Sequence, residues 1–333
     1  MAERSFDVTA IGNAIVDVIA KADDDLLATH GLAKSAMSLI DAATAERLYG
    51  IMGPGREMSG GSAANTAAVI AALGGRVAYI GKVADDQLGD VFTHDIRAIG
   101  VTYDTSPLTE GLSTARCLIF VTPDAHRTMQ TFLGATTQLG PEDLNMDYIT
   151  SSKVVYLEGY LWDQPRAKSA MRDAAITAHA HGVKVALTLS DAFCVARFRD
   201  EFLELAEEHV DILFANESEI LSLYQVERFD DALQHVRQHC EVAALTRSEK
   251  GSVVVNGDEV HVIDAEQGVK VVDTTGAGDA YAAGFLYGFT QGYDLAACGR
   301  LGSVMAAEII GHYGARPEAD VRALATAAVG RPR

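Results

Sequence analysis

The sequence predicts an α/β protein with a mainly parallel sheet, helices on both faces of that sheet, and a small β-rich lid. Short runs rich in Val and Ile alternate with helical patterns along most of the 333 residues. Such alternation is typical of parallel sheets covered on both faces. Two stretches, 14–22 with its continuation to 37–40 and 112–132, have strand character without a convincing crossover helix. We expect these stretches to form the lid, because such excursions often cover a site.

The strands of the main sheet are predicted from apolar runs bounded mostly by Gly, Asp or Asn. They cover residues 6–12, 77–81, 154–157, 184–188, 211–215 and 242–246. Helical patterns cover residues 62–73, 85–99, 165–181, 277–290 and 295–310. The sequence contains no Ser/Pro-rich linker and no fixed-period repeat. We therefore expect one core, residues 1–12, 42–110 and 135–333, and a discontinuous lid, residues 13–41 and 111–134.

The charge balance argues against nucleic acid and membranes as partners. The chain has 27 Lys and Arg against 46 Asp and Glu, a net charge of −19, which repels polyanions. Its start has no signal-peptide pattern, and no apolar run is long enough for a membrane span. The four cysteines lie far apart, which is typical of free thiols in a reducing compartment. We expect a cytoplasmic monomer or homodimer.

The segment DTTGAGD, from Asp273 to Asp279, is the most informative motif. It is a Gly-rich turn between an apolar run and an Ala/Phe-rich helical pattern. Glycines let the backbone approach a ligand, and the first N–H groups of a helix attract anions. Asp279 would lie beside that anion, where a carboxylate is unfavourable unless it accepts a proton from an attacking hydroxyl. Helix capping by Asp273 or Asp279 is the simpler alternative.

Two further segments offer polar groups to a hydroxylated ligand. In GGSAAN, glycines again lead into a helix, and Asn65 lies in its first turn. An amide can both donate to and accept from a hydroxyl, although a tight turn with a packed helix is the simpler explanation of this motif alone. In GNAIVD, Asn13 and Asp17 are four residues apart, so in a strand both would share one face. They could bind vicinal hydroxyls, or they could simply face solvent.

The segments NESE and TRSEKG carry weaker signals. Asn216 and Glu219 are three residues apart on one predicted helical face. Their oxygens suit Mg²⁺, an ion that keeps several waters, but taken alone a solvated helix start capped by Asn216 is the simpler explanation. Residues 246–251 join two expected strands, as an ordinary turn or as a loop that faces a nucleotide.

DTTGAGD together with GGSAAN resembles the paired signatures of the ribokinase-like (PfkB) carbohydrate and nucleoside kinase family, and NESE resembles its NxxE magnesium motif. The resemblance covers nearly the whole chain. It implies a ribokinase-like fold, ATP as phosphoryl donor, Mg²⁺, and a sugar or nucleoside substrate. It further implies roles for single residues. The catalytic group would be Asp279 as general base and Gly276, Ala277 and Gly278 as the anion hole. Substrate binding would involve Asn13, Asp17, Gly61, Asn65, Arg127 and Tyr160. Nucleotide or metal binding would involve Asn216, Glu219, Thr246, Gly251 and Thr274, with Asp273 and Thr275 for a possible K⁺ ion.

Within the family, the start of the chain resembles adenosine kinases. Asn13 and Asp17 are four residues apart, which resembles the spacing of the corresponding Asn and Asp in these enzymes. In adenosine kinases this aspartate holds ribose hydroxyls. Tyr160 and Trp162 fall where adenosine kinases have aromatic residues beside the base, although core packing is an equal explanation. The implied activity is transfer of phosphate from ATP to the 5′-hydroxyl of a nucleoside, adenosine giving AMP. A sugar kinase of the same family is the runner-up, and a non-catalytic sensor of nucleosides or sugars is the alternative from another class. In the nucleotide loop, Ser248 replaces the first glycine of the usual TxGxxG pattern.

Overall fold

The computed structural model describes residues 4–124 and 126–330 and contains two sheets. The main sheet has nine strands in the order β14-β13-β12-β11-β10-β9-β1-β5-β6. Its strands are β1 (Phe6–Ile11), β5 (Val77–Ile80), β6 (Thr102–Tyr103), β9 (Ser152–Glu158), β10 (Lys184–Thr188), β11 (Ile212–Asn216), β12 (Val242–Thr246), β13 (Ser252–Asn256) and β14 (Glu259–Ile263). All neighbouring strands are parallel except β12–β13 and β13–β14. The predicted mainly parallel α/β fold is therefore confirmed.

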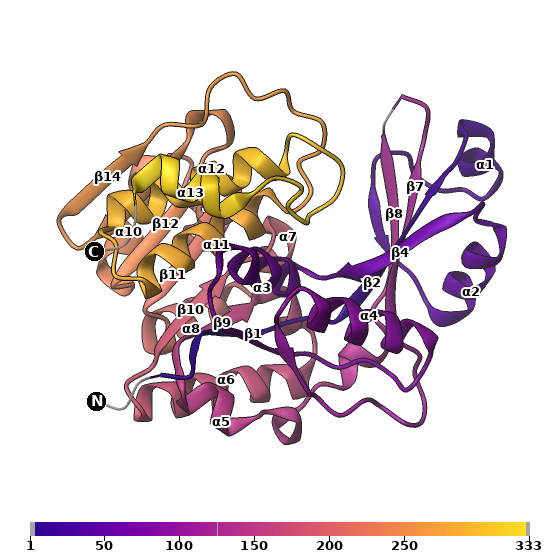
Figure 1. Cartoon of the computed structure of the whole chain (residues 1–333), viewed down its shortest axis with the longest axis horizontal. Helices are drawn as coiled ribbons and strands as arrows, with labels where there is room; N and C mark the ends of the chain where they lie inside the picture. The colour runs from indigo at the N-terminus through magenta and orange to yellow at the C-terminus, as the bar shows by residue number, and fades with distance from the viewer. Residues whose placement is uncertain (1–3, 125, 331–333) are drawn as a thin grey trace.

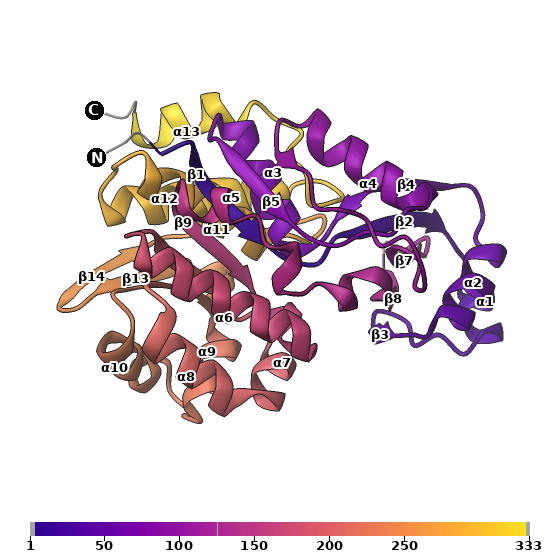
Figure 2. The ribbon, with the colours of Figure 1, turned by 90° about the horizontal axis from the view of Figure 1, so that it is seen from below.

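Helices cover both faces of the main sheet (Figures 1 and 2). One face carries α3 (Ser62–Leu73), α11 (Ala277–Thr290), α12 (Leu295–Ile309) and α13 (Val321–Val329), with α4 (Gln87–Ala98) beside them. The other carries α5 (Met146–Thr150), α6 (Pro165–Ala180), α7 (Ala192–Arg197), α8 (Arg199–His209), α9 (Glu217–Tyr224) and α10 (Phe229–His239). Side chains of a strand alternate between the two cores: Val154 and Tyr156 face the first, and Val155 and Leu157 the second. Because both of their faces are buried, the central strands β10, β11 and β12 are mostly apolar, whereas the edge strand β14 is largely exposed.

The second sheet has five strands in the order β3-β8-β7-β2-β4 and stands to one side of the core (Figure 1). Its strands are β2 (Ile15–Lys21), β3 (Met37–Leu39), β4 (Gly55–Gly60), β7 (Ala115–Val121) and β8 (Arg127–Phe132), with α1 (Asp24–Thr29) and α2 (Ala42–Ile51) beside them. Four of these strands come from the two predicted excursions. The fifth, β4, lies inside residues 42–110, which the sequence had assigned to the core, and pairs with β2. Its sequence, GREMSG, has no apolar alternation, so only pairing makes it a strand.

Polar side chains gather where the parallel strands end. Asn13 follows β1, Glu158 ends β9, Asn216 ends β11 and Thr246 ends β12. Parallel strands place their carboxyl ends at one edge of a sheet, which is where open α/β sheets bind ligands. The short helices η1 (Gly134–Gln138), η2 (Pro141–Asp143), η3 (Gly159–Asp163) and η4 (Ser248–Lys250) complete the described secondary structure. Among the residues described, no helix is long and apolar enough to cross a bilayer.

Candidate active site

The turn 273–279 leads into the N-terminus of α11, as the sequence predicts. Gly276 precedes the helix with φ of +78°, and a Cβ atom there would stand 2.5 Å from the Cβ of Ala315. Only glycine therefore fits this turn. The helix N-terminus has no side-chain cap hydrogen bond, so the first N–H groups keep their capacity to bind an anion. Thr274 and Gly278 are exposed on this turn.

Asp279 is held by the first turn of α3. Its Oδ1 accepts from Ser62 Oγ at 2.6 Å, and its Oδ2 accepts from Asn65 Nδ2 at 3.0 Å. Burial raises the pKa of Asp279, while the two hydrogen bonds and the charge of Arg316 lower it. The structure therefore joins Asp279 and Asn65, two predicted site residues more than two hundred positions apart in the chain. It adds Ser62, which the GGSAAN motif contained but which had no assigned role.

Asp17, on β2 of the small sheet, lies near enough to Asp279 and Arg316 for their charges to affect its ionisation. Burial raises its pKa to about 6, Arg316 and Arg127 lower it, and Asp279 raises it. The Asp17 carboxylate rests against Gly60, where a Cβ atom would stand 2.6 Å from Oδ2. Asp279 on the core and Asp17 on the small sheet are thus close enough for the charge of Asp279 to raise the pKa of Asp17.

Asn13, by contrast, is engaged within the protein. Its Nδ2 donates to Glu158 Oε1 at 2.6 Å, and its Oδ1 accepts from Thr136 Oγ1 at 2.9 Å. The other oxygen of Glu158 accepts from the backbone N–H groups of Asn13 (3.3 Å) and Ala63 (2.9 Å). Glu158 is 1% exposed, and burial raises its pKa to about 7. Glu158 was not predicted from the sequence, although a carboxylate at the end of a buried apolar strand is a usable signal.

Gly61 is needed for close packing beside Asn13. Its φ is +100°, and a Cβ atom would stand 2.1 Å from the carbonyl oxygen of Asn13. The backbone turns here from β4 into α3. The glycine therefore allows α3 to present Ser62 and Asn65 to Asp279.

Arg127, at the start of β8, joins the small sheet to the turn before α11. Its Nη2 lies 2.8 Å from Asp273 Oδ2, and both side chains are buried. The same oxygen accepts from the N–H of Gly314 at 3.0 Å, while Oδ1 accepts from the N–H and hydroxyl of Thr275 at 3.1 and 2.8 Å. Four donors match the four lone-pair directions of a carboxylate. The Asp273 carboxylate is therefore fully occupied in this conformation and does not fit as a K⁺ ligand.

Asn216 and Glu219 form a reciprocal cap at the start of α9. Asn216 Oδ1 accepts from the Glu219 N–H at 2.9 Å, and Glu219 Oε2 accepts from the Asn216 N–H at 2.9 Å. The Asn216 amide also donates to Glu219 Oε1 at 2.6 Å. Burial raises the pKa of Glu219 to about 7. In the described parts of the chain, no three His, Cys, Asp or Glu side chains gather as a metal site.

The loop after β12 keeps a glycine-like backbone despite Ser248. Ser248 adopts φ of +52°, in the left-handed region that glycine favours. Gly251 has φ of +81°, and a Cβ atom there would stand 2.0 Å from the carbonyl oxygen of Ile263. The departure from the usual loop pattern thus changes a side chain but leaves the loop closed, with the Arg247 N–H bonded to Gly251 O at 2.8 Å. Thr246 is the last residue of β12 and is partly exposed.

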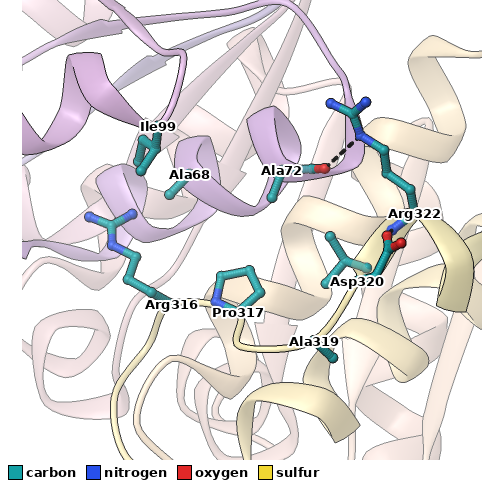
Figure 3. Close-up of a pocket in the computed structure, with 9 residues that line it drawn as sticks. Ala68, Ala72, Ile99, Arg316, Pro317, Ala319, Asp320 and Arg322 are labelled. Carbon is teal, nitrogen blue, oxygen red and sulfur yellow. Dashed lines mark hydrogen bonds between the residues drawn. The ribbon is translucent and has the colours of Figure 1, made fainter.

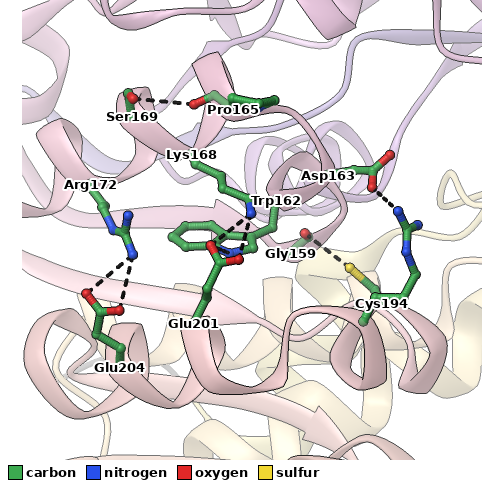
Figure 4. A network of polar contacts seen from close by, with 11 residues as sticks. Gly159, Trp162, Asp163, Pro165, Lys168, Ser169, Arg172, Cys194, Glu201 and Glu204 are labelled. Carbon is green, nitrogen blue, oxygen red and sulfur yellow. Dashed lines mark hydrogen bonds and ion pairs between the residues drawn. The ribbon is translucent and has the colours of Figure 1, made fainter.

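The structure separates the two candidate aromatic residues in η3. Trp162 is fully buried among α6 and α8, and its Nε1 donates to Glu201 at 3.0 Å (Figure 4). Its ring also packs on Phe202, with centroids 5.6 Å apart. Tyr160 is 39% exposed, and its hydroxyl is 3.4 Å from the carbonyl oxygen of Ser190. Trp162 is therefore core packing, and Tyr160 is the aromatic residue that remains available to a ligand.

The fold and this site define a kinase that transfers phosphate to an alcohol: residues 51–322 match the pfkB family carbohydrate kinases, and the chain belongs to that family. Two solved structures are especially similar. The adenosine kinase from Sinorhizobium meliloti is 56% identical, covers 97% of this chain and 99% of its own, and has a TM-score of 0.90. The probable sugar kinase from Rhizobium etli CFN 42 is 52% identical, with 98% and 99% coverage and a TM-score of 0.90. The adenosine kinase of Saccharomyces cerevisiae is 26% identical over 90% of this chain and 93% of its own.

Membership of the family confirms the predicted class of enzyme and the ribokinase-like fold. The substrate is a sugar or a nucleoside, and the phosphoryl donor is ATP, usually with Mg²⁺. The names of the relatives divide between adenosine kinases and sugar kinases.

Proposed function

We propose that the chain is a cytoplasmic adenosine kinase that transfers the γ-phosphoryl group of ATP to the 5′-hydroxyl of adenosine. The observation that carries the proposal is the approach of Asp17 on the small sheet to Asp279 on the core, where Asp279 is itself hydrogen-bonded to Asn65. A ribose held through vicinal hydroxyls by Asp17 would present its 5′-hydroxyl towards Asp279. The 56% identity to the adenosine kinase from S. meliloti supports this choice of substrate.

The residues of the site divide the chemistry between a base and an anion-binding turn. As the 5′-oxygen attacks the γ-phosphorus, its O–H proton passes to Asp279, an O–P bond forms, and the bond from the γ-phosphorus to ADP breaks. A raised pKa makes Asp279 a better proton acceptor than an ordinary aspartate. The N–H groups at the start of α11 stabilise the charge that spreads over the phosphoryl oxygens. The small sheet would exclude water from the site when it closes.

Asn216 and Glu219 fit a supporting role toward Mg²⁺. A single buried carboxylate with its amide neighbour is too small a set for direct coordination, but Mg²⁺ keeps several waters and binds mainly through nucleotide phosphates. Asn216 and Glu219 would hold two of those waters. When bound with ATP, the ion neutralises charge on the phosphates. Thr246, Gly251 and Thr274 would line the nucleotide.

A panel of alcohols with ATP as donor tests the substrate. We expect adenosine to exceed 2′-deoxyadenosine by at least ~10-fold in kcat/KM, because hydrogen bonds to a charged partner contribute about 1.5–3 kcal/mol each. Asp17→Ala should lower kcat/KM for both substrates and narrow the difference in kcat/KM between them. Asp17→Asn, which keeps the shape of the side chain, is the matched variant. Ribose and fructose should be poor substrates, because they have no base to contact Tyr160.

Three results would overturn parts of this proposal. If a free pentose or hexose has a higher kcat/KM than every nucleoside, the adenosine-kinase hypothesis is wrong and the sugar-kinase alternative takes its place. If deoxyadenosine equals adenosine while Asp17→Ala abolishes activity, Asp17 holds a different group. No phosphate transfer to any alcohol would favour a sensor over an enzyme.

A further inference from the structure

Arg316 lies in the loop between α12 and α13, and its side chain extends to α3 and β4 beside the active site. Its Nη1 donates to the carbonyl oxygen of Ala64 at 2.7 Å. Its Nη2 donates to the carbonyl oxygen of Ser59 at 3.0 Å and to the Ser59 hydroxyl at 3.1 Å. One guanidinium group therefore joins the C-terminal part of the core to β4 of the small sheet and to the first turn of α3.

Both partners of Arg316 adjoin an acid of the site. Ala64 precedes Asn65, whose amide donates to Asp279. Ser59 precedes Gly60, against which the Asp17 carboxylate lies. The guanidinium is thus bonded to the residues that directly precede Asn65, which contacts Asp279, and Gly60, which contacts Asp17. Its position fixes the spacing between the segment that carries the base and the strand that backs Asp17.

The charge of Arg316 acts on both acids. It lowers the pKa of Asp17 and of Asp279, against the burial that raises them. Burial lowers the pKa of Arg316 itself to about 10, so it stays protonated at neutral pH. Arg127 from the small sheet also lowers the pKa of Asp17, and Tyr79 and Asp95 from the core raise the pKa of Arg316. In turn, the charge of Asp17 raises the pKa of Cys117, and the charge of Asp279 raises the pKa values of Tyr156, Glu158 and Tyr160.

We propose that Arg316 is a positioning residue that holds Asp17 and Asp279 together in their ionised forms, so that one can bind substrate while the other accepts a proton. Two carboxylates in one site repel each other, and one of them protonates unless a positive charge lies near enough to stabilise both. Arg316 supplies that charge, and its hydrogen bonds to the carbonyl oxygens of Ala64 and Ser59 hold the guanidinium in place. This inference rests on the proposed role of Asp279.

A neighbouring arginine provides a matched control. Arg316 lines a cavity of about 280 Å³ behind α3, together with Ala68, Ala72, Ile99 and Arg322 (Figure 3). Arg322 lies at the opposite end of this cavity and donates from Nε to the carbonyl oxygen of Ala72 at 2.9 Å. It has the same charge and a similar backbone contact, but it sits at the far end of α3 from Asn65. A substitution of Arg322 therefore reports the loss of an arginine from this cavity without a change at the two acids.

The test is the pH dependence of kcat/KM for Arg316→Gln, Arg316→Met, Arg316→Lys and the control Arg322→Gln, each checked by thermal melting. An opposite charge near an aspartate lowers its pKa by about 1–3. We expect the acid limb of Arg316→Gln and Arg316→Met to move up by about one pH unit, so that kcat/KM at the acid end falls about ten-fold below wild type. Arg316→Lys, which keeps the charge, should stay within roughly 0.3 pH units of wild type, as should Arg322→Gln. Titration of ATP itself is common to all variants and cancels in the comparison.

The outcomes separate this inference from the proposed function. An unchanged acid limb in whichever neutral variant folds would overturn it and leave Arg316 a purely structural bridge. If both neutral variants fail to fold, Arg316→Lys is the deciding variant. An acid limb of kcat/KM that moves up by a full pH unit despite the retained charge would overturn the inference, and an acid limb that does not move would support it. If wild type shows no activity with adenosine, or Asp279→Asn keeps wild-type turnover, the failure lies instead in the proposed function.

Discussion

Replacement of Glu158 by Gln should stabilise the substrate-free protein at alkaline pH. Glu158 is 1% exposed, and burial raises its pKa from the ordinary 4.5 to about 7. The folded protein therefore binds this proton more tightly than the unfolded chain does. The contribution of Glu158 to stability is fully present below pH 4.5 and is lost as the pH rises to about 7. Above that pH, the folded protein carries a buried charge that Gln would not have.

The size of the effect follows from the same two values. Each factor of ten in proton affinity corresponds to 1.36 kcal/mol, so a pKa raised from 4.5 to about 7 amounts to about 3 kcal/mol at pH 8. The glutamine can keep the local hydrogen bonds. Its carbonyl oxygen would accept from the N–H groups of Asn13 and Ala63, and its NH₂ would donate to an Asn13 amide turned over, which leaves the Asn13 NH₂ to the hydroxyl of Thr136.

Urea unfolding at pH 5, 6, 7 and 8 measures the difference between wild type and Glu158→Gln. We expect the two curves to approach each other at pH 5 and to separate by about 3 kcal/mol at pH 8, with the variant more stable. Asp17 and Glu219 also have raised pKa values, but they are present in both proteins and cancel in the difference. A difference that does not change with pH would refute the reasoning, because the glutamate would then titrate alike in folded and unfolded chains.

Three further substitutions test the site. Asp279→Asn should lower kcat about 10²–10⁴-fold with ATP affinity retained, measured by steady-state kinetics and ATP calorimetry; near wild-type turnover would remove Asp279 as the base. Glu219→Gln should raise the magnesium concentration needed for half-maximal rate and leave adenosine affinity without ATP unchanged, whereas an unaltered magnesium titration would make the pair with Asn216 a helix cap alone. Gly251→Ala should lower the melting temperature, since its Cβ would stand 2.0 Å from the carbonyl oxygen of Ile263, and an unchanged melting temperature would contradict the strained φ of +81°.

The sequence predicted the core elements closely where the pattern was strongly periodic or apolar. Strands β10 and β12 and helices α3 and α11 have the bounds expected from the sequence. Strand β4 and helix α1 were missed. GREMSG has no β pattern, and α1 is only six residues long and begins with a single Asp cap. Both depend on neighbours that a local pattern does not show.

The candidate site was predictable to the extent that its residues lie in motifs. Asp279 and Asn65 come from such motifs, and the structure joins them directly. Glu158 and Arg316 were missed, because the importance of each depends on segments distant in sequence: β1 for Glu158, and α3 with β4 for Arg316. Periodicity could not decide between Tyr160 and Trp162 either, since a short 3₁₀ helix places neighbouring residues on different sides.

The central place of β1 in the main sheet has a consequence for synthesis on the ribosome. Strand β1 leaves the ribosome first among the strands, but its two neighbours are β5, beginning at residue 77, and β9, beginning at residue 152. On a chain that grows at roughly 5–20 residues per second, β1 waits on the order of ten seconds for its second neighbour. During that interval an apolar strand has an unpaired edge, which other nascent chains could join. We therefore expect nascent chains that end before β9 to bind chaperones or aggregate, and chains that extend beyond β9 to do so less.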